Sequence, residues 1–364
     1  MSTHSNRRSL ISFIVKILAG MTIYSFSLIE LGFEVKYICI FAYSKGQYIT
    51  TPLFCLNILI MKRSLLRIAF WGTLLPFVSC SVMKDSAKSN SDNFPKLSLE
   101  AHRGGRGLYP EESIAAMKNA IDLAKVTTLE MDCHITKDRK VVVFHDDYLN
   151  PKFVLKPNGS EISDKDKPLR IYDMLYKDLI KYDIGSKFYK EFPEQKKQVT
   201  RIAKLSDLID STEAYASLKR KAPMFYNIEV KSKEDKDGIF HPRVEEFVDL
   251  MVQVITDKKI ATRTVIQSFD SRAIKYLHKA YPQIKVSYLI DANYTKSVQQ
   301  TIADLGFTPF IISPHYKIAT SDFITQCHKA AIKVIPWTVN TKDEIEQLKA
   351  VKVDGIISDY PNLF

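Results

Sequence analysis

From Leu97 to the C-terminus, short apolar runs alternate with segments of helical periodicity. The short runs are four to seven residues long and bounded by polar residues, and the longer segments repeat apolar residues at spacings of three and four. This alternation is typical of βα units, whose strands form a parallel sheet. We expect strands at 97–103, 128–133, 141–145, 225–231, 265–269, 286–290, 310–314, 334–339 and 355–358, and helices at 114–125, 244–256, 271–281, 297–305, 321–331 and 343–350.

The number of strands favours a β/α barrel. Nine candidates are one more than an eight-stranded barrel needs. Only residues 134–140 separate the second from the third, which is too short for a crossover helix, so we expect a partial hairpin or an irregular barrel there. Residues 148–204 are polar and interrupt the alternation. We predict that they form an insertion on the face where the loops after the strands gather, which is the active-site face of such barrels.

Two apolar segments precede this region. Segment 9–33 is long and apolar enough to cross a bilayer, although Lys16 and Glu30 interrupt it. The second segment starts at Met61, with a positively charged beginning, an apolar stretch at 65–77 and a small-residue context before Cys80. It resembles a bacterial lipoprotein signal peptide, with Phe77 in place of the usual aliphatic residue. The resemblance implies cleavage before Cys80 and acylation of that residue.

A signal peptide works at the start of a chain, so we expect Met61 to be the initiator and residues 1–60 to be a non-native upstream extension. Residues 61–79 are then the signal peptide, 80–96 a polar tether and 97–364 the barrel. The mature protein would be exported to the periplasmic side and anchored to a bacterial membrane through lipidated Cys80. The alternative is an N-terminal transmembrane anchor at 9–33, with Cys80 a plain thiol.

Composition and charge narrow the functional classes. With 46% hydrophobic and 26% charged residues, the 364-residue chain has globular composition, which excludes collagen-like, coiled-coil and wholly disordered proteins. The net charge is +11, but +6 of it falls within residues 1–79, and no nucleic-acid-binding motif accompanies the rest. We therefore expect no nucleic-acid partner. Cys133 and Cys327 are too distant in sequence to indicate a disulfide framework.

Ionisable residues end four consecutive candidate strands, in the sequences His102-Arg103, Glu130-Met131-Asp132, His145-Asp146 and Glu229-Val230-Lys231. Because side chains alternate along a strand, Glu130 and Asp132 share one side, as do Glu229 and Lys231. Carboxylates gathered at one barrel mouth repel each other, and a hard divalent cation such as Ca²⁺ or Mg²⁺ neutralises them. Zinc fits less well, because it prefers His and Cys ligands.

The same residues resemble a known family, the glycerophosphodiester phosphodiesterases. The family pattern is His-Arg-Gly, Pro-Glu-Asn-Thr, Glu-x-Asp, Lys-Asp-Gly and His-Asp. Here Glu112 replaces Asn, Ser113 replaces Thr and Arg139 replaces Gly. The likeness continues through 227–231, 267–269, 337–340 and 354–361, and residues 181–185 resemble the periplasmic members. The matching stretches are His102-Arg103-Gly104, Pro110-Glu111-Glu112-Ser113, Glu130-x-Asp132, Lys137-Asp138-Arg139 and His145-Asp146.

The resemblance implies an α/β fold, a TIM-type (β/α)8 barrel of the PI-PLC-like phosphodiesterase kind. It also implies metal-dependent hydrolysis of a small-molecule glycerophosphodiester to sn-glycerol 3-phosphate and an alcohol. The implied roles are general acid–base catalysis by His102 and His145, Ca²⁺ or Mg²⁺ binding by Glu130, Asp132 and Glu229, substrate binding by Arg103, Lys231, Phe269 and Trp337, and support of the metal shell by Glu111.

Other activities are compatible with the same residues. A phospholipase acting on intact lipid, or a hydrolase of polyglycerolphosphate, would use the same acid–base pair and cation. A non-catalytic binding barrel is disfavoured by the intact set of His102, His145 and carboxylates. The preferred head group, the cation, a cyclic phosphate intermediate and the oligomeric state stay open at this point.

Overall fold

The computed structural model describes the strands of the N-terminal region, within residues 11–60, and residues 93–163 and 168–364 in full. The chain divides into two compact units, Met1–Met83 and Lys84–Phe364. The described part of the first unit is an antiparallel sheet in which β1 pairs with β2, β2 with β3, and β3 with both β4 and β5. Its strands are β1 (Ile11–Leu18), β2 (Met21–Glu30), β3 (Phe33–Ser44), β4 (Gln47–Tyr48) and β5 (Cys55–Ile60).

Within segment 9–33 the structure describes two strands, β1 and β2. β1 and β2 form an antiparallel pair in register from Ile11 opposite Leu28 to Leu18 opposite Met21. β-branched and aromatic residues dominate both strands and favour extended backbone. Within the described residues, no helix has the length and apolar character needed to span a bilayer. The predicted signal peptide and Cys80 lie in 61–92, outside the described residues.

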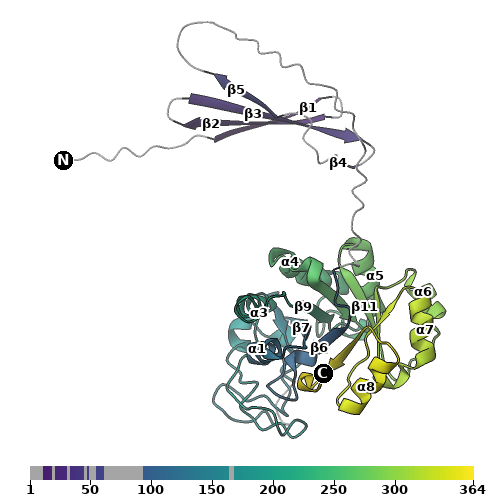
Figure 1. The fold of residues 1–364 in the computed structure, drawn as a ribbon. Coiled ribbons are helices and arrows are strands. Elements are labelled where there is room, and N and C mark those ends of the chain that lie inside the picture. Colours follow the sequence, from purple (N-terminus) through teal and green to yellow (C-terminus); the bar gives the residue numbers. More distant parts are fainter. Residues whose placement is uncertain are drawn as a thin grey trace. The chain divides into compact units, whose positions relative to one another are not determined.

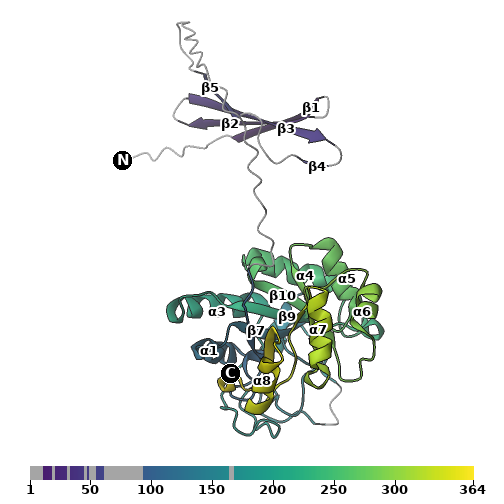
Figure 2. The ribbon, with the colours of Figure 1, turned by 45° about the vertical axis from the view of Figure 1, so that its right-hand side comes forward.

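The second unit is the predicted barrel (Figures 1 and 2). Eight parallel strands follow one another in the order β13-β12-β11-β10-β9-β7-β6-β14, with helices outside them. Backbone hydrogen bonds from Asp354 N to Val334 O (2.9 Å) and from Val339 N to Ile357 O (2.9 Å) nearly close the ring between its two ends. The strands are β6 (Ser98–Ala101), β7 (Thr128–Ile135), β9 (Phe225–Val230), β10 (Thr264–Ser268), β11 (Lys285–Ile290), β12 (Ile311–Pro314), β13 (Lys333–Val334) and β14 (Gly355–Ser358).

One of the nine predicted strands is not a strand of the parallel barrel. β8 (Val141–Val143) pairs antiparallel with the end of β7, from Cys133 opposite Val143 to Ile135 opposite Val141. The hairpin alternative is therefore confirmed. The described helices around the barrel are α1 (Ile114–Asp122), α3 (Leu205–Lys219), α4 (Val244–Asp257), α5 (Ser271–Ala280), α6 (Val298–Leu305), α7 (Ser321–Lys329) and α8 (Lys342–Ala350).

Close packing of β14 against β6 depends on Gly355. A Cβ at this position would lie 2.4 Å from the Ser98 carbonyl oxygen and 2.8 Å from the Ser98 Cβ. Real Cβ atoms do not approach that closely, so only glycine lets the last strand reach the first. This contact brings the ends of β6 and β14 together, and both ends carry site residues.

Helix α3 is not among the helices that the sequence predicts. Its buried face contains Leu205, Leu208 and Ile209 but continues with Thr212 and Ala216, so its apolar pattern is weak. The Thr212 hydroxyl donates to the Leu208 carbonyl within the helix and lies 3.1 Å from the Tyr226 hydroxyl. A polar residue on a buried helix face is therefore satisfied locally, which apolar periodicity cannot reveal.

The insertion at 148–204 has a small apolar core of its own. Phe153, Ile184, Tyr189 and Phe192 are buried together there with Phe144 of the barrel. The short helix α2 (Tyr176–Leu179) lies within the insertion. The insertion lies beside the barrel mouth, because two of its side chains contact Arg106. The Gln195 side chain donates to the Arg106 carbonyl (2.8 Å), and the Arg106 guanidinium lies over the Phe192 ring.

Candidate active site at the carboxyl ends of the strands

Three buried carboxylates meet where β7 and β9 lie side by side. In the parallel register Asp132 is opposite Glu229 and Glu130 is opposite Asn227, so the three acids face one another across two strands. One oxygen from each of Glu130, Asp132 and Glu229 lies within 4.8 Å of the others. The structure thus brings together all three residues for which the sequence predicted a metal-binding role.

Two cations border this triad. The Arg103 guanidinium contacts Glu111 Oε1 at 3.0 Å and Asp132 Oδ2 at 3.2 Å. Lys231 Nζ lies 3.1 Å from Glu229 Oε1 and 3.8 Å from Asp132 Oδ1. Both predicted phosphate-binding residues therefore lie beside the carboxylates at one site.

Backbone geometry holds Arg103 in place. Arg103 has a positive φ of 51°, directly after β6, and its N–H donates to Glu130 Oε2 at 2.8 Å. Gly104 follows with a φ of 80°, and a Cβ there would lie 2.8 Å from the Ala116 Cβ on α1. The His-Arg-Gly motif is therefore a sharp turn that packs on α1 and directs the Arg103 amide toward the carboxylates.

The pKa values of the three carboxylates reflect their burial and the charges around them. Burial and the nearby Asp132 charge raise the pKa of Glu130 well above its usual value, and burial raises the pKa of Glu229 to about 8. Burial opposes ionisation of Asp132 too, but Lys231, His145 and Arg103 together hold its pKa well below the usual range. The set of ligand atoms is all oxygen and rich in negative charge, which fits a hard divalent cation.

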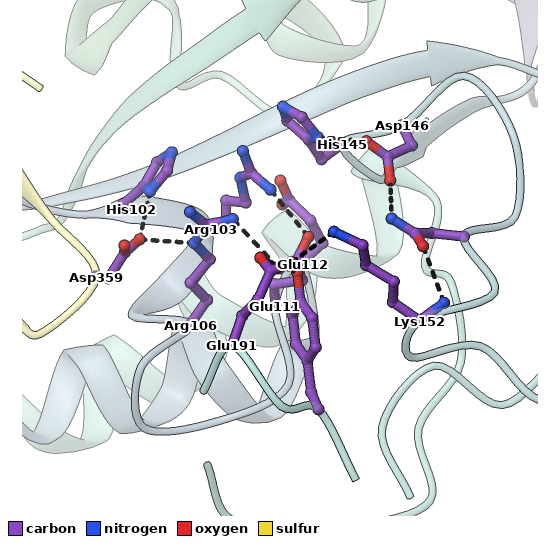
Figure 3. A network of polar contacts seen from close by, with 12 residues as sticks. His102, Arg103, Arg106, Glu111, Glu112, His145, Asp146, Lys152, Glu191 and Asp359 are labelled. Atoms are coloured by element: carbon purple, nitrogen blue, oxygen red, sulfur yellow. Dashed lines mark hydrogen bonds and ion pairs between the residues drawn. The ribbon is translucent and has the colours of Figure 1, made fainter. Parts of the chain in front are cut away.

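His102 is oriented by the last strand of the barrel (Figure 3). Its Nδ1 lies 2.5 Å from Asp359 Oδ1, just after β14. Asp359 also accepts from Arg106 Nε (2.8 Å) and from Asn340 Nδ2 (2.7 Å). Burial lowers the pKa of His102 to about 4, while its charged and hydrogen-bonded neighbours hold the pKa of Asp359 well below its usual value against the effect of burial.

His145 occupies the other side of the site, with Arg103 between the two imidazoles in Figure 3. Its Nδ1 lies 2.7 Å from Asp146 Oδ1, and Asn150 Nδ2 donates to the second oxygen of Asp146 at 2.6 Å. The His145 side chain is 29% exposed, against 12% for His102. Burial lowers the pKa of His145, and the charges of Lys231 and Arg103 lower it further. Both imidazoles thus have a carboxylate at Nδ1.

Two acids before α1 have different positions. Glu111 contacts Arg103 and Arg106, at 3.0 Å and 3.6 Å, and so lies beside the site. Glu112 is fully buried with a φ of 60°, and its Oε1 accepts the backbone N–H of Asp132 at 3.0 Å. In the sequence, Glu112 stands out only as a departure from the family pattern. The structure shows that it contacts a residue of the triad.

The two aromatic residues for which the resemblance implies substrate binding lie together. The rings of Phe269 and Trp337 meet edge to face with centroids 5.4 Å apart, and Trp337 Nε1 donates to the Ser313 carbonyl at 2.9 Å. Both rings line a cavity of about 280 Å³ that also contains His102 and His145, together with the triad, Arg103 and Lys231. Of the predicted site residues, only Glu111 is outside this lining, behind Arg103.

Several polar residues that support the site were not assigned a role from sequence. Besides Asp359 and Asn340, Gln267 Nε2 donates to Glu130 Oε1 at 2.8 Å, and Asn227 donates to Gln267 and to Glu100. Their position in the sequence could have indicated these residues, because Asn227, Gln267 and Asp359 all lie in or just after predicted strands. Their specific partners come from other strands, which no local pattern reveals.

Comparisons with known proteins bear on the family and the fold of the chain. A family model described as the glycerophosphoryl diester phosphodiesterase family matches residues 102–363. The chain is 26% identical to a glycerophosphodiester phosphodiesterase of Caldanaerobacter subterraneus over 72% of its length and 93% of the relative's. It is 25% identical to one of Bacillus subtilis, over 80% and 92%. An Oleispira antarctica phosphodiesterase in complex with the product sn-glycerol-3-phosphate shares the fold, with a TM-score of 0.57, 23% identity and coverage of 73% and 94%.

Proposed function

Because this chain belongs to the glycerophosphoryl diester phosphodiesterase family, and is an enzyme of that class, we propose that it hydrolyses glycerophosphodiesters to sn-glycerol 3-phosphate and an alcohol, aided by a divalent cation. One observation carries the proposal. Two imidazoles, each with a carboxylate at Nδ1, line the same cavity as a buried triad of carboxylates and two cationic side chains. Together these groups can transfer the two protons of phosphodiester hydrolysis and hold a cation that draws charge from the phosphoryl oxygens.

Glu130, Asp132 and Glu229 would hold the cation, either Ca²⁺ or Mg²⁺. When bound, such a cation draws negative charge from the phosphoryl oxygens of the substrate. Arg103 and Lys231 lie at the border of the triad and keep further N–H donors for those oxygens. Glu111 keeps the Arg103 guanidinium in its orientation through the contact at 3.0 Å.

The carboxylates at Nδ1 define what each imidazole can do. The pKa of Asp359 is well below its usual value and that of Asp146 is about 2, so both are ionised and act only as acceptors. The Nδ1 atoms of His102 and His145 must then carry the proton, which leaves each Nε2 to exchange protons with substrate. One imidazole, neutral and unprotonated at Nε2, accepts the proton of the attacking oxygen. The other, protonated at both nitrogens, donates its Nε2 proton to the departing alcohol oxygen.

Release of glycerol 3-phosphate tests the proposal. Purified protein is incubated with glycerophosphocholine and with glycerophosphoethanolamine, with and without excess chelator, and the product is detected by a coupled enzyme. We expect release that chelator abolishes and Ca²⁺ or Mg²⁺ restores. Release only from lipid vesicles would instead assign a phospholipase activity. No release from any diester at saturating cation would overturn the proposal.

We also propose, from the sequence alone, that Met61 initiates the chain and that lipidated Cys80 anchors it on the periplasmic side of a bacterial membrane. Several acyl chains hold a protein firmly, whereas a single one gives reversible binding. The test is mass spectrometry of protein from native membranes, with Cys80→Ala as the comparison. Peptides from residues 1–60 together with an unmodified Cys80 would contradict this proposal.

A further inference from the structure

The catalytic cavity opens into a larger one on the His145 side. This second cavity has a volume of about 590 Å³, against about 280 Å³ for the first. The two share His145, Glu229, Lys231 and Phe269. His102 lines only the smaller cavity. A diester whose phosphoryl group lies at the triad would therefore extend one half into the small cavity and the other half into the large one.

The two cavities correspond to the two halves of a glycerophosphodiester, one constant and one variable. All glycerophosphodiesters have the same glycerol phosphate half, and the small cavity contains both imidazoles and the Trp337 wall that this constant half requires. The other half is variable. A cavity of 590 Å³ lies within the range of about 300–1,000 Å³ that takes drug-sized ligands, far larger than ethanolamine or choline require. The large cavity is thus the space for the alcohol.

Outside the catalytic set, the charged groups that line the large cavity are balanced. The ammonium group of Lys236 donates to the Asp147 carboxylate, and Lys231 contacts Glu229. The two remaining charged groups of its lining outside the catalytic set are Lys233 and Asp291, which are exposed and of opposite sign. Asp146, which lies at His145 Nδ1, also lines the cavity and belongs to the catalytic set. Outside that set the lining has as many cationic as anionic groups, and it offers both hydrogen-bond donors and acceptors.

Two exposed aromatic side chains complete the lining. Tyr148 is 38% exposed and Phe269 is 39% exposed, and both line this cavity. Exposed aromatic rings in a polar cavity provide apolar surface for the C–H groups of a ligand, while hydroxyl groups bind the surrounding donors and acceptors. An adjoining cavity of about 400 Å³ shares Asp147, Tyr148 and Lys236 and gives room for a longer alcohol.

We propose that the large cavity binds the leaving alcohol and that it is built for a neutral polyol, such as a cyclitol or a sugar alcohol, in preference to choline or ethanolamine. His145, which lines both cavities, is then the residue that donates a proton to the departing oxygen. This inference rests on the proposed phosphodiesterase activity and adds to it the class of the alcohol and the residues that recognise it.

The first test is a comparison of substrates at saturating cation. We expect kcat/KM for glycerophosphoinositol to exceed that for glycerophosphocholine by about tenfold, which corresponds to about 1.4 kcal/mol and to the net contribution of one hydrogen bond. An equal or higher kcat/KM for glycerophosphocholine would overturn the inference while leaving the proposed function intact. Hydrolysis of neither substrate would instead contradict the proposed function.

The second test uses the Lys236–Asp147 pair. Lys236→Met leaves Asp147 unpaired and gives the cavity a negative charge, so we expect the ratio of kcat/KM values to shift toward glycerophosphocholine. Asp147→Asn leaves Lys236 unpaired, and we expect the opposite shift. Opposite shifts cannot come from general damage to the fold. Equal loss on both substrates in both variants would contradict the role of this cavity.

Tyr148 provides the third test, with a matched control. Tyr148→Ala is expected to lower kcat/KM for glycerophosphoinositol more than for glycerophosphocholine. Phe188 is also an exposed aromatic residue of the insertion, at 54% exposure, and it is absent from the lining of all three cavities. Phe188→Ala should therefore leave both kcat/KM values unchanged. A Tyr148→Ala variant that behaves like this control would overturn the proposed contact.

Discussion

His102 and Asp359 are 257 residues apart in sequence, and their side chains meet at 2.5 Å. The first follows β6 and the second follows β14, which pair in register with Ser358 opposite Ala101. Closure of the barrel therefore builds the imidazole–carboxylate pair. The close approach at Gly355 that allows the two strands to pack is thus also a condition for this pair.

Asp359→Asn tests what the carboxylate does for His102. The amide of asparagine can donate to Nδ1, which stabilises the tautomer whose proton is on Nε2, the wrong one for accepting a proton from substrate. We expect kcat to fall by roughly 10²–10⁴-fold with little change in KM, as expected when positioned proton transfer is lost. Steady-state kinetics measure this. A kcat within twofold of the wild-type value would contradict the orienting role.

The two histidines themselves give a second prediction. His102→Ala and His145→Ala should each lower kcat by roughly 10²–10⁴-fold, because each removes one proton-transfer group. Thermal unfolding should change little, since neither side chain is part of the apolar core. His278→Ala is the control, because this residue stacks on Phe307 and lines none of the three cavities. Normal turnover in His145→Ala would contradict the assignment of His145 as a proton-transfer residue.

The sequence could predict that the candidate site residues lie together, because strand periodicity and strand ends are local properties. Glu130 and Asp132 are two apart on one strand, and Glu229 ends the next parallel strand, so their meeting follows from the order of βα units. The contact of Asp359 with His102, by contrast, depends on which strands close the ring. Likewise α3 was missed because Thr212 finds its partner inside its own helix. Long-range partners and locally satisfied polar residues leave no trace in apolar periodicity.

Glu112 is expected to act through Asp132. Its Oε1 accepts the buried N–H of Asp132, and its φ of 60° favours asparagine over alanine. Glu112→Ala leaves that N–H without a partner, which costs roughly 1–3 kcal/mol. We therefore expect weaker Ca²⁺ binding in calorimetry and lower stability in urea. Glu112→Asn, which can keep the acceptor and restores the family pattern, should retain most of both. The prediction fails if Glu112→Ala binds Ca²⁺ as tightly as the wild type.

Cation binding by the triad can be measured without turnover. Isothermal titration of chelator-treated protein with Ca²⁺ or Mg²⁺ should show one site. Glu130→Gln, Asp132→Asn and Glu229→Gln should each bind more weakly, because a site with one carboxylate fewer attracts a hard cation less. Glu161→Gln is a control, because this carboxylate lies on the insertion with a 71% exposed side chain. Unchanged affinity in all three triad variants would place the cation elsewhere.

The raised pKa of Glu229 makes the stability of the cation-free protein depend on pH. Burial raises this pKa from 4.5 to about 8, so the folded state favours the protonated form. The contribution of Glu229 to stability is present below about pH 4.5 and is lost as the pH rises through 8. The depressed pKa of His102, about 4, acts in the opposite direction but only below its usual 6.5. Of these two groups, only Glu229 therefore changes the stability between pH 6.5 and 8, and its titration lowers the stability as the pH rises.

We expect the Tm of chelator-treated protein to fall from pH 6.5 to pH 8, and excess Ca²⁺ to raise Tm more at pH 8 than at pH 6.5. A bound cation favours the ionised carboxylates, and a ligand that binds only the folded state stabilises it. Glu229→Gln removes the titrating group, so its Tm in chelator should fall less over the same range. Differential scanning calorimetry at the two pH values decides between the outcomes. If the Tm in chelator falls no more in wild type than in Glu229→Gln, the titration of Glu229 does not govern the stability of the cation-free protein in this range.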